Sequence, residues 1–169
     1  GVGTLGIIDF DVVDESNLQR QVIHGVSDLG KPKALSAKES IVEINPHVNV
    51  ILHEERLDSD NALDIFRPYD LVLDGTDNFA TLYLVNDACV KHNKPWIYGG
   101  AVASYGASMT IVPHISACFR CVFRHAPPPG TLPTCDTAGV IGPIVNVIGS
   151  LVSAEALKFI TGSGEGWGE

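Results

Sequence analysis

Short apolar runs that end in acidic residues alternate with amphipathic segments along the first hundred residues. The runs Leu5–Asp9 and Asp70–Asp74 are typical of buried parallel strands. Apolar residues at helical spacing predict a helix over 32–44, and alternating apolar residues predict a strand over 48–52. The further expected elements, in chain order, are a helical turn at 14–20, helices at 62–66 and 79–92, strands at 96–98 and 108–112, and a helix at 140–160. This alternation predicts an α/β, Rossmann-like fold, with a mostly parallel sheet and helices on both faces.

The pattern changes after residue 117. Four prolines between 127 and 133 exclude a helix or a central strand, so residues 125–137 are expected to form a crossover loop. The uncharged stretch Ala138–Ala154 contains Pro143 and is shorter than the ~20 apolar residues of a membrane span, which favours a buried core helix. The glycine-rich residues 161–169 are expected to be mobile. We interpret residues 1–169 as one domain that is incomplete at both ends.

Composition and charge limit the classes of binding partner and the cellular compartment that we expect for this protein. The chain has 169 residues and a formal net charge of -9, so nucleic acid and anionic membranes are disfavoured because both are polyanions. The first residues lack the basic and apolar regions of a secretory signal. Four cysteines in a chain of this kind do not indicate a disulfide scaffold. We therefore expect a protein of the reducing cytoplasm.

Polar side chains follow the predicted strands, where ligands bind in open α/β sheets. Asp9 and Asp11 follow the first strand, and Asp9 is placed to bond ribose hydroxyls, with a loop cap as the alternative. A second polar set follows the strand at 71–73, namely Asp74, Thr76, Asp77 and Asn78. The third set, Gly99, Gly100 and Ser104, follows the strand at 96–98.

Cations lie just beyond the expected ribose site. Arg20 is about one helical turn from Asn17, so both side chains face the same way. Arg20 offers a planar fork for phosphate oxygens, and Lys33 offers a point charge. Ser16 and Gln19 have capping-box spacing. The sequence leaves open whether these residues form a phosphate site or a solvated helix face.

The Asp77-Asn78 pair also has two readings. A carboxylate at a strand end near phosphates suits Mg²⁺, which takes few protein carboxylates and keeps its waters. Asp and Asn are equally good N-caps for the helix that begins near Phe79. Both roles are compatible.

The cysteines fall into three groups. Cys118-x-x-Cys121 has the spacing of half a Cys₄ zinc site, and we favour zinc over redox chemistry because proline-rich sequence follows closely. Cys135 is expected in an exposed polar loop, as a nucleophile or persulfide carrier or as an incidental thiol. Cys89, mid-helix, is expected in the core.

The order and spacing of these motifs resemble the MoeB/ThiF-type adenylyltransferases, also called the HesA/MoeB/ThiF family, which are related to the ubiquitin-activating enzymes. The matching motifs are Asp9-Phe10-Asp11-x-Val13, Ser16-Asn17-Leu18-x-Arg20-Gln21, Gly30-x-Pro32-Lys33, Asn45-Pro46, Asp74-x-Thr76-Asp77-Asn78, Cys118-x-x-Cys121 and Thr134-Cys135 before Gly139-Val140. They run along nearly the whole chain. The family's glycine-rich loop and its second C-x-x-C are absent from this sequence, and we expect both in the intact gene product.

The resemblance implies a function and its partners. Such enzymes use Mg·ATP to adenylate the C-terminal glycine of a small ubiquitin-like sulfur carrier that ends in Gly-Gly, for molybdopterin or thiamin biosynthesis. The implied set of ATP-binding residues is Asp9, Asp11, Ser16, Asn17, Gln19, Arg20, Lys33, Asp77 and Asn78. The implied catalytic residues are Arg20, Asp77 and Cys135, and Cys118 and Cys121 are the implied half of a structural Zn²⁺ site. A homodimer is implied, as is a sulfurtransferase or cysteine desulfurase as a further partner.

Two other functions fit parts of the sequence. A NAD-dependent oxidoreductase would use the same ribose acid, but hydride transfer needs no triphosphate clamp of the Arg20 and Lys33 kind. A catalytically inactive docking module for a ubiquitin-like protein would bind its partner without ATP. In the family such modules usually lack the Arg and the Asp, and this sequence has Arg20 and Asp77.

Overall fold

The computed structural model describes residues 2–128 and 135–163, and the side chains of residues 135 and 136 are not described. The chain divides into two compact units, Gly1–Leu57 and Asp58–Glu169. Part of the expected crossover loop (129–134) and most of the expected mobile tail (164–169) lie outside the described residues.

The first unit is a β–α–β element. Strand β1 (Thr4–Ile8) pairs in parallel with β2 (Asn49–His53), and helix α1 (Lys33–Ile44) connects them. Helix α1 begins after Pro32, whose fixed φ suits a helix start, and ends at Asn45 before Pro46. It buries its small side chains and packs against β2. The predicted strands at 5–9 and 48–52 and the helix at 32–44 are confirmed within one or two residues.

The long connection between β1 and α1 is pinned at its ends. The backbone N–H of Val13 donates to Lys31 O (2.8 Å), and the N–H of Lys33 donates to Asp11 O (2.8 Å). Two short 3-10 turns, Glu15–Asn17 (η1) and Val26–Asp28 (η2), lie between these bonds. The connection is therefore a folded loop with a closed neck, and the helical turn predicted over 14–20 is a single 3-10 turn.

The capping box that we predicted in this loop uses different residues. Asp14 is the N-cap of η1, and its carboxylate accepts a hydrogen bond from the Ser16 N–H (2.9 Å). The Asn17 side chain returns the bond by accepting from the Asp14 N–H (3.1 Å). The prediction from Ser16 and Gln19 was wrong by two residues, because the turn begins at Glu15, which places Asp14 at the N-cap and Asn17 at N3.

The second unit holds a three-stranded sheet in the order β3–β4–β5. Strand β3 (Val72–Asp74) pairs in parallel with β4 (Trp96–Val102), and β4 pairs antiparallel with β5 (Tyr105–Ile111). The predicted strands at 96–98 and 108–112 were too short. Gly99 and Gly100 lie inside β4, because β4 and β5 are seven residues long each and pair along their whole length, so that each satisfies the backbone groups of the other.

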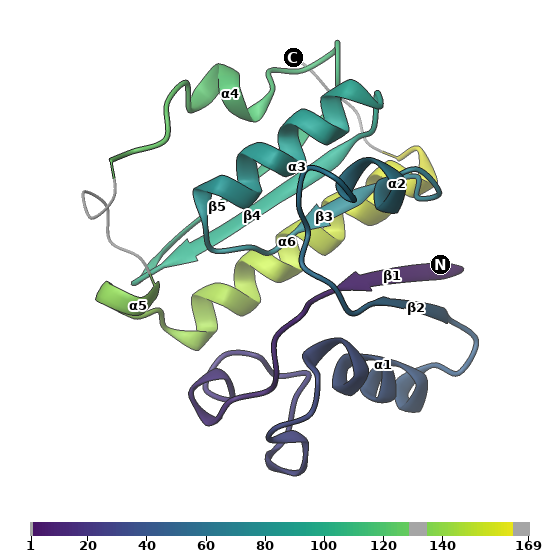
Figure 1. Ribbon diagram of the computed structural model, residues 1–169, viewed down its shortest axis with the longest axis vertical. Helices are drawn as coiled ribbons and strands as arrows, with labels where there is room; N and C mark the ends of the chain where they lie inside the picture. The colour runs from purple at the N-terminus through teal and green to yellow at the C-terminus, as the bar shows by residue number, and fades with distance from the viewer. Residues whose placement is uncertain (1, 129–134, 164–169) are drawn as a thin grey trace. The chain divides into compact units, whose positions relative to one another are not determined.

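Helices cover both faces of this sheet (Figure 1). Because side chains alternate along β4, Ile97 faces helix α6 (Gly142–Thr161), where Ile148 and Val152 are buried with it. Trp96, on the opposite face, makes a ring contact with Phe119 of the short helix α4 (Phe119–Val122), which packs on α3 (Phe79–Lys91). The prediction of an α/β fold with helices on both faces is confirmed.

Two glycines allow α6 to approach the hairpin. A Cβ atom on Gly99 would lie 2.7 Å from Val152 Cγ2, and one on Gly106 would lie 2.4 Å from Ile148 Cγ1. Such distances are far below van der Waals contact, so only glycine permits this spacing. Gly99 therefore has a packing role in the sheet, and it does not belong to a loop after the strand as we expected.

Helix α6 is buried along one stripe only. Its inward residues Ile148, Val152 and Ala156 are buried, whereas Val147 and Leu151 are about half exposed (53% and 50%). By length and composition α6 could cross a membrane, and 17% of its most apolar window is buried. The predicted core helix is confirmed on its sheet-facing side, and its other side carries exposed apolar residues. Gly162 ends it in the left-handed conformation (φ 67°) that commonly closes helices.

Two short helices complete the second unit. Helix α2 (Ala62–Phe66) matches the predicted segment and packs on α3 through buried Ile65 and Phe66. Helix α5 spans Cys135–Ala138, so Cys135 begins a helical turn where we expected an irregular loop. The role of Cys135 as a candidate nucleophile stays a prediction.

Candidate nucleotide-binding site and cysteine pair

The first group of candidate residues follows the carboxyl end of β1. The Asp9 carboxylate accepts a hydrogen bond from the Asp11 N–H (2.9 Å), so the loop-cap reading of Asp9 is confirmed. Asp11 in turn forms an ion pair with Lys33 (Oδ2 to Nζ, 3.1 Å), and the Lys33 side chain is only 13% exposed. These three residues thus form one charged cluster at the end of the strand, where ligands bind in open α/β sheets.

Asn17 and Arg20 lie on the turn η1 and the residues just after it. Asn17 is 8% exposed, and its amide is committed to the capping box. The Arg20 guanidinium donates from Nη1 to the carbonyl oxygen of Ser16 (3.0 Å). Because a guanidinium carries five N–H donors, this bond leaves Arg20 able to fork onto an anion. Gln19 is exposed on the same turn.

The second group lies in the other unit, at the carboxyl end of β3. Asn78 is the N-cap of α3, and its side chain accepts from the Thr81 N–H (2.9 Å), so the cap reading of Asn78 is confirmed. Asp77, the preceding residue, is exposed. The same turn is braced by the Thr76 hydroxyl, which donates to Asp74 Oδ1 (2.9 Å). This arrangement presents the Asp77 carboxylate outward from a rigid turn.

Asp74, the first member of the polar set predicted after the strand at 71–73, is a buried acid at the end of β3. It is 7% exposed, and its Oδ2 accepts no hydrogen bond from the described residues. Burial raises the pKa of Asp74 to about 6, and the hydrogen bond from Thr76 offsets only part of that rise. The nearby charge of Asp77 adds to it. The ionised form is thus costly in the folded chain.

A pH-dependent stability follows from Asp74. Its pKa in the folded chain (about 6) lies above the ordinary value of 3.8, so the contribution of Asp74 to stability is fully present below pH 4 and is lost as the pH rises through 6. Asp74→Asn should leave the free energy of unfolding unchanged near pH 4 and raise it by up to about 3 kcal/mol above pH 7. Urea unfolding at both pH values checks this, with exposed Asp60→Asn as control. An equal effect at both pH values would contradict the assignment.

The Cys118-x-x-Cys121 motif forms a compact turn. Cys118 is the N-cap of α4, the Cys121 N–H donates to Cys118 O (2.9 Å), and the two Sγ atoms lie 3.3 Å apart. Both thiols are free. Partial burial opposes ionisation of Cys118, but hydrogen bonds from Cys121 and from the backbone outweigh it and lower the pKa of that thiol. A loop was expected here, but residues 119–122 form the short helix α4, which packs on α3.

Four contacts anchor this turn to α3. The fully buried Asn86 accepts a hydrogen bond from the Phe119 N–H (2.9 Å). Arg120 forms two charge-assisted bonds to Asp87 and lies over the ring of Tyr83 (4.6 Å to its centroid). Phe119 is 0% exposed. Together these contacts hold the two sulfur atoms in place through side chains outside the motif.

The thiol pair fits one edge of a zinc site. Zn–S bonds of about 2.3 Å in a tetrahedron set the sulfur atoms roughly 3.8 Å apart, close to the distance seen here. Among the described residues no three His, Cys, Asp or Glu side chains group to hold a metal ion. For Mg²⁺, Asp77 fits the usual arrangement of one or two protein carboxylates, with phosphate oxygens and water as the other ligands.

The other cysteines differ from this pair. Cys89 is fully buried, as predicted, and burial raises its pKa to about 12, which makes it inert at neutral pH. Cys135 is the first residue of α5.

Some structurally important residues were missed in the sequence. Asp14 caps η1, His24 contacts Ser36, and Asn86 anchors α4. Only Asp14 carried a recognisable signal, the spacing Asp14-x-x-Asn17 of a capping box. The other contacts join residues 12 and 33 positions apart, which no local pattern reveals.

Comparison with known proteins identifies the family of the chain. Residues 1–167 match the ThiF family. The chain is 53% identical over 169 residues to the probable adenylyltransferase/sulfurtransferase MoeZ of Mycobacterium tuberculosis, covering 98% of this chain and 43% of that protein. It is 46% identical over 171 residues to the sulfur carrier protein adenylyltransferase of Thermus thermophilus, covering 98% of this chain and 63% of that protein. The chain thus spans less than two thirds of either relative.

Solved structures show the same fold. The crystal structure of Escherichia coli MccB with AMPCPP and MccA matches with a TM-score of 0.82 at 24% identity, over 99% of this chain and 52% of that one. MccB with ATP matches with a TM-score of 0.80 at 23% identity, covering 99% and 51%. At this identity the likeness concerns the fold alone. The family match over nearly all residues and the high identity to the two curated relatives show that this chain belongs to the ThiF family of MoeB/ThiF-type proteins.

Proposed function

We propose that the protein uses ATP to adenylate the C-terminal glycine of a small ubiquitin-like sulfur-carrier protein, yielding an acyl-adenylate and pyrophosphate. The observation that carries the proposal is the placement of Arg20 and Lys33 in one compact unit with Asp9, which directly follows strand β1. An acid at a strand end suits a ribose, and two cations suit a triphosphate. The relatives named above as adenylyltransferases support the same reaction.

The reaction makes modest demands on the protein. The glycine carboxylate attacks the α-phosphorus, an acyl–phosphate bond forms, the bond to the β-phosphate breaks, and pyrophosphate leaves with the electron pair. No proton has to move, since a carboxylate is already a nucleophile. Both reactants are anions, so catalysis consists of positioning them and of spreading positive charge over the phosphates.

The residues of the first unit have assigned tasks in this proposal. Asp9 holds the ribose, and Asn17 and Arg20 bind phosphate oxygens. Lys33 exchanges its ion pair with Asp11 for a phosphate oxygen, a small movement because the 3.1 Å pair already sits at the strand end. The ion pair with Asp11 thus holds the Lys33 ammonium group in a defined position before the nucleotide binds.

In the second unit, the exposed Asp77 would hold Mg²⁺ through its water shell, and Asn78 keeps the turn before α3 in place by capping that helix. Bound Mg²⁺ would supply positive charge that stabilises the nucleotide phosphates.

Two alternatives are weaker. A NAD-dependent oxidoreductase has no use for Arg20 and Lys33 near a third phosphate. An inactive docking module would retain carrier binding without ATP, and it has no need of an outward-facing Asp77. We keep both as outcomes of the experiment below.

ATP–pyrophosphate exchange tests the proposal. The full-length gene product should exchange labelled pyrophosphate into ATP only when a carrier ending in Gly-Gly is added, and a carrier without the last glycine should be inactive. Carrier binding without exchange would identify a docking module. Nicotinamide-dependent turnover would favour the oxidoreductase.

A structural zinc site forms part of the proposal. Cys118 and Cys121 provide two thiolate ligands, with two further ligands from outside the described residues. The full-length protein should contain about one zinc per chain, and Cys118→Ser should remove most of it. Metal analysis by mass spectrometry checks this, with Cys89→Ala as the control that retains zinc. Unchanged zinc in Cys118→Ser would contradict the site.

The remaining assignments complete the proposal. We place the enzyme in the cytoplasm, as a homodimer that could use the exposed apolar side of α6, in molybdopterin or thiamin biosynthesis. A sulfurtransferase or cysteine desulfurase supplies the sulfur, and Cys135 is its candidate acceptor.

A further inference from the structure

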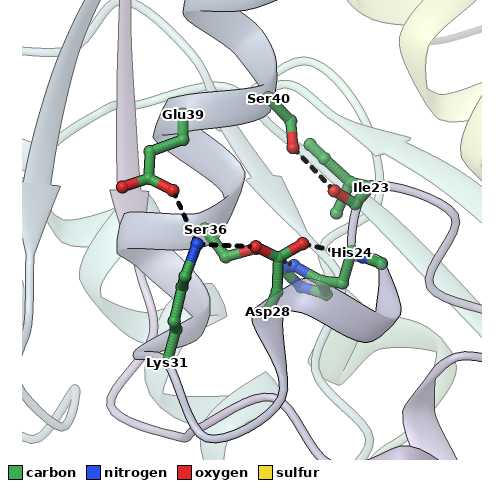
Figure 2. A network of polar contacts seen from close by, with 8 residues as sticks. Ile23, His24, Asp28, Lys31, Ser36, Glu39 and Ser40 are labelled. Carbon is green, nitrogen blue, oxygen red and sulfur yellow. Dashed lines mark hydrogen bonds and ion pairs between the residues drawn. The ribbon is translucent and has the colours of Figure 1, made fainter.

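A stripe of α1 side chains faces the loop that carries Arg20. Lys33, Ser36 and Ser40 are spaced three and four residues apart, so they lie along one side of the helix. The Ser36 hydroxyl contacts His24 (Oγ to Nδ1, 2.8 Å), and the Ser40 hydroxyl donates to the carbonyl oxygen of Ile23 (2.8 Å). Two adjacent loop residues are thus fastened to two successive turns of the helix (Figure 2).

The contact with Ser36 is partly buried and lies near an acid. Ser36 is 1% exposed, so its hydroxyl cannot turn to solvent for a partner. The Asp28 carboxylate accepts hydrogen bonds from the Gly25 N–H (2.8 Å) and from Lys31 (3.0 Å), and both bonds lower its pKa. Lys31 bridges Asp28 (3.0 Å) and Glu39 (3.1 Å), which ties the same loop to α1 a second time.

Backbone hydrogen bonds transmit this fastening to Arg20. The N–H of His24 donates to Gln21 O (3.1 Å), and the N–H groups of Gln21 and Arg20 donate to Asn17 O (2.9 and 3.0 Å). The first of these turns spans residues 17–21 and contains Arg20, and the second spans 21–24 and contains Ile23. The two turns share Gln21, so hydrogen-bonded backbone connects Arg20 to Ile23. Lys33 stands at the first turn of the same helix stripe.

We propose that His24 is a positioning residue: through Ser36 it holds the turn that bears Arg20 at a fixed distance from Lys33, so that both cations meet one polyphosphate together. The inference rests on the proposed phosphate roles of Arg20 and Lys33. His24 touches neither nucleotide nor carrier in this scheme. Without the contact the loop keeps its closed neck at Val13 and Lys31 and the bond from Ser40 to Ile23, but it loses one of the two adjacent attachments in its middle.

Steady-state exchange kinetics in the full-length protein test the inference. His24→Ala should lower kcat/KM for ATP by about 3- to 10-fold, the worth of one hydrogen bond. His24→Asn, whose side-chain amide reaches the place of Nδ1, should recover most of it. His47→Ala, at an exposed site in the same unit, should have no effect.

A double-mutant comparison separates positioning from a general structural defect. If His24 acts through Arg20, adding His24→Ala to Arg20→Ala should change kcat/KM by less than twofold. Full additivity of the two losses would overturn the proposal. The urea midpoint of each variant is measured alongside, because a loss that follows global stability would also overturn it.

Amide hydrogen exchange decides the inference independently of ATP. In His24→Ala, residues 17–24 should exchange at least several-fold faster while α1 keeps its protection. Unchanged exchange in this segment would overturn the proposal. If the wild-type protein shows no pyrophosphate exchange but His24→Ala loosens residues 17–24, the contact is real and the proposed function has failed.

Discussion

Arg20→Ala is expected to lower the rate of carrier-dependent ATP–pyrophosphate exchange by about 100- to 1000-fold, the usual cost of removing one preorganised donor from a developing negative charge. The loss should be large because Arg20 sits on the rigid turn after η1, bonded to the Ser16 carbonyl, and needs no reorganisation to meet a phosphate. Stability should change by less than about 0.5 kcal/mol, since a partly exposed arginine in a surface loop contributes little to folding. Exchange kinetics and urea unfolding together check both parts.

Asp77→Ala should cause a loss of similar size for a different reason, since it removes the carboxylate proposed to organise Mg²⁺. Raising the Mg²⁺ concentration should recover part of the activity of Asp77→Ala and none of that of Arg20→Ala. Arg67→Ala serves as the control, because Arg67 is an exposed cation in a surface ion pair with Asp64. Retention of more than a tenth of the exchange rate in Arg20→Ala would remove Arg20 from the catalytic residues.

Phe119→Ala is expected to lower the free energy of unfolding by about 3–5 kcal/mol, the usual range for a buried aromatic residue cut to alanine. Phe119 is 0% exposed and makes ring contacts with Tyr83, Trp96 and Tyr98 at centroid distances of 5.5, 6.0 and 5.3 Å. It joins α3, α4 and one face of β4, so no single neighbour can move to fill the cavity. Urea unfolding measures the loss.

Phe119→Leu keeps the fold accessible if the alanine variant fails to fold, and it should cost about 1–1.5 kcal/mol. Tyr105→Ala is the matched control, since that aromatic side chain is 75% exposed and should change stability by less than about 0.5 kcal/mol. Because Phe119 lies between Cys118 and Cys121, the leucine variant should also bind zinc more weakly, even under conditions in which it is fully folded. A stability loss below 1 kcal/mol in Phe119→Ala would show that this cluster does not hold the unit together.

Local patterns predicted most of the elements. The apolar runs before Asp9 and within 71–74, the Pro32 start and Asn45 end of α1, and the cap at Asn78 are read from neighbouring residues, and the structure has each of them. Fold class followed from their alternation. The family could also be identified in the sequence, because motifs such as Ser16-Asn17-Leu18-x-Arg20-Gln21 keep their order and spacing along the chain.

Tertiary pairing changed other predictions. The extent of β4 through Gly99 and Gly100 depends on its hydrogen bonds to β5, and Gly-Gly in isolation indicates a turn. The Cys118-x-x-Cys121 turn is helical because Asn86, 33 residues before Phe119, satisfies its first N–H. The long apolar stretch at α6 did not reveal which of its sides meets the sheet and which stays exposed.

The sequence by itself determined the order of the elements, the residues at the strand ends and the family, because caps, strand periodicity and motif spacing act between residues close in the chain. The tertiary structure decided which polar groups pair with one another. Lys33 forms an ion pair with Asp11, His24 forms a hydrogen bond with Ser36, and Asn86 accepts one from the Phe119 backbone. It also decided the pKa of Asp74. The physical reason is that burial and hydrogen-bond partnership depend on what distant segments bring to the same place, and a polar group costs free energy or contributes stability only once that environment exists.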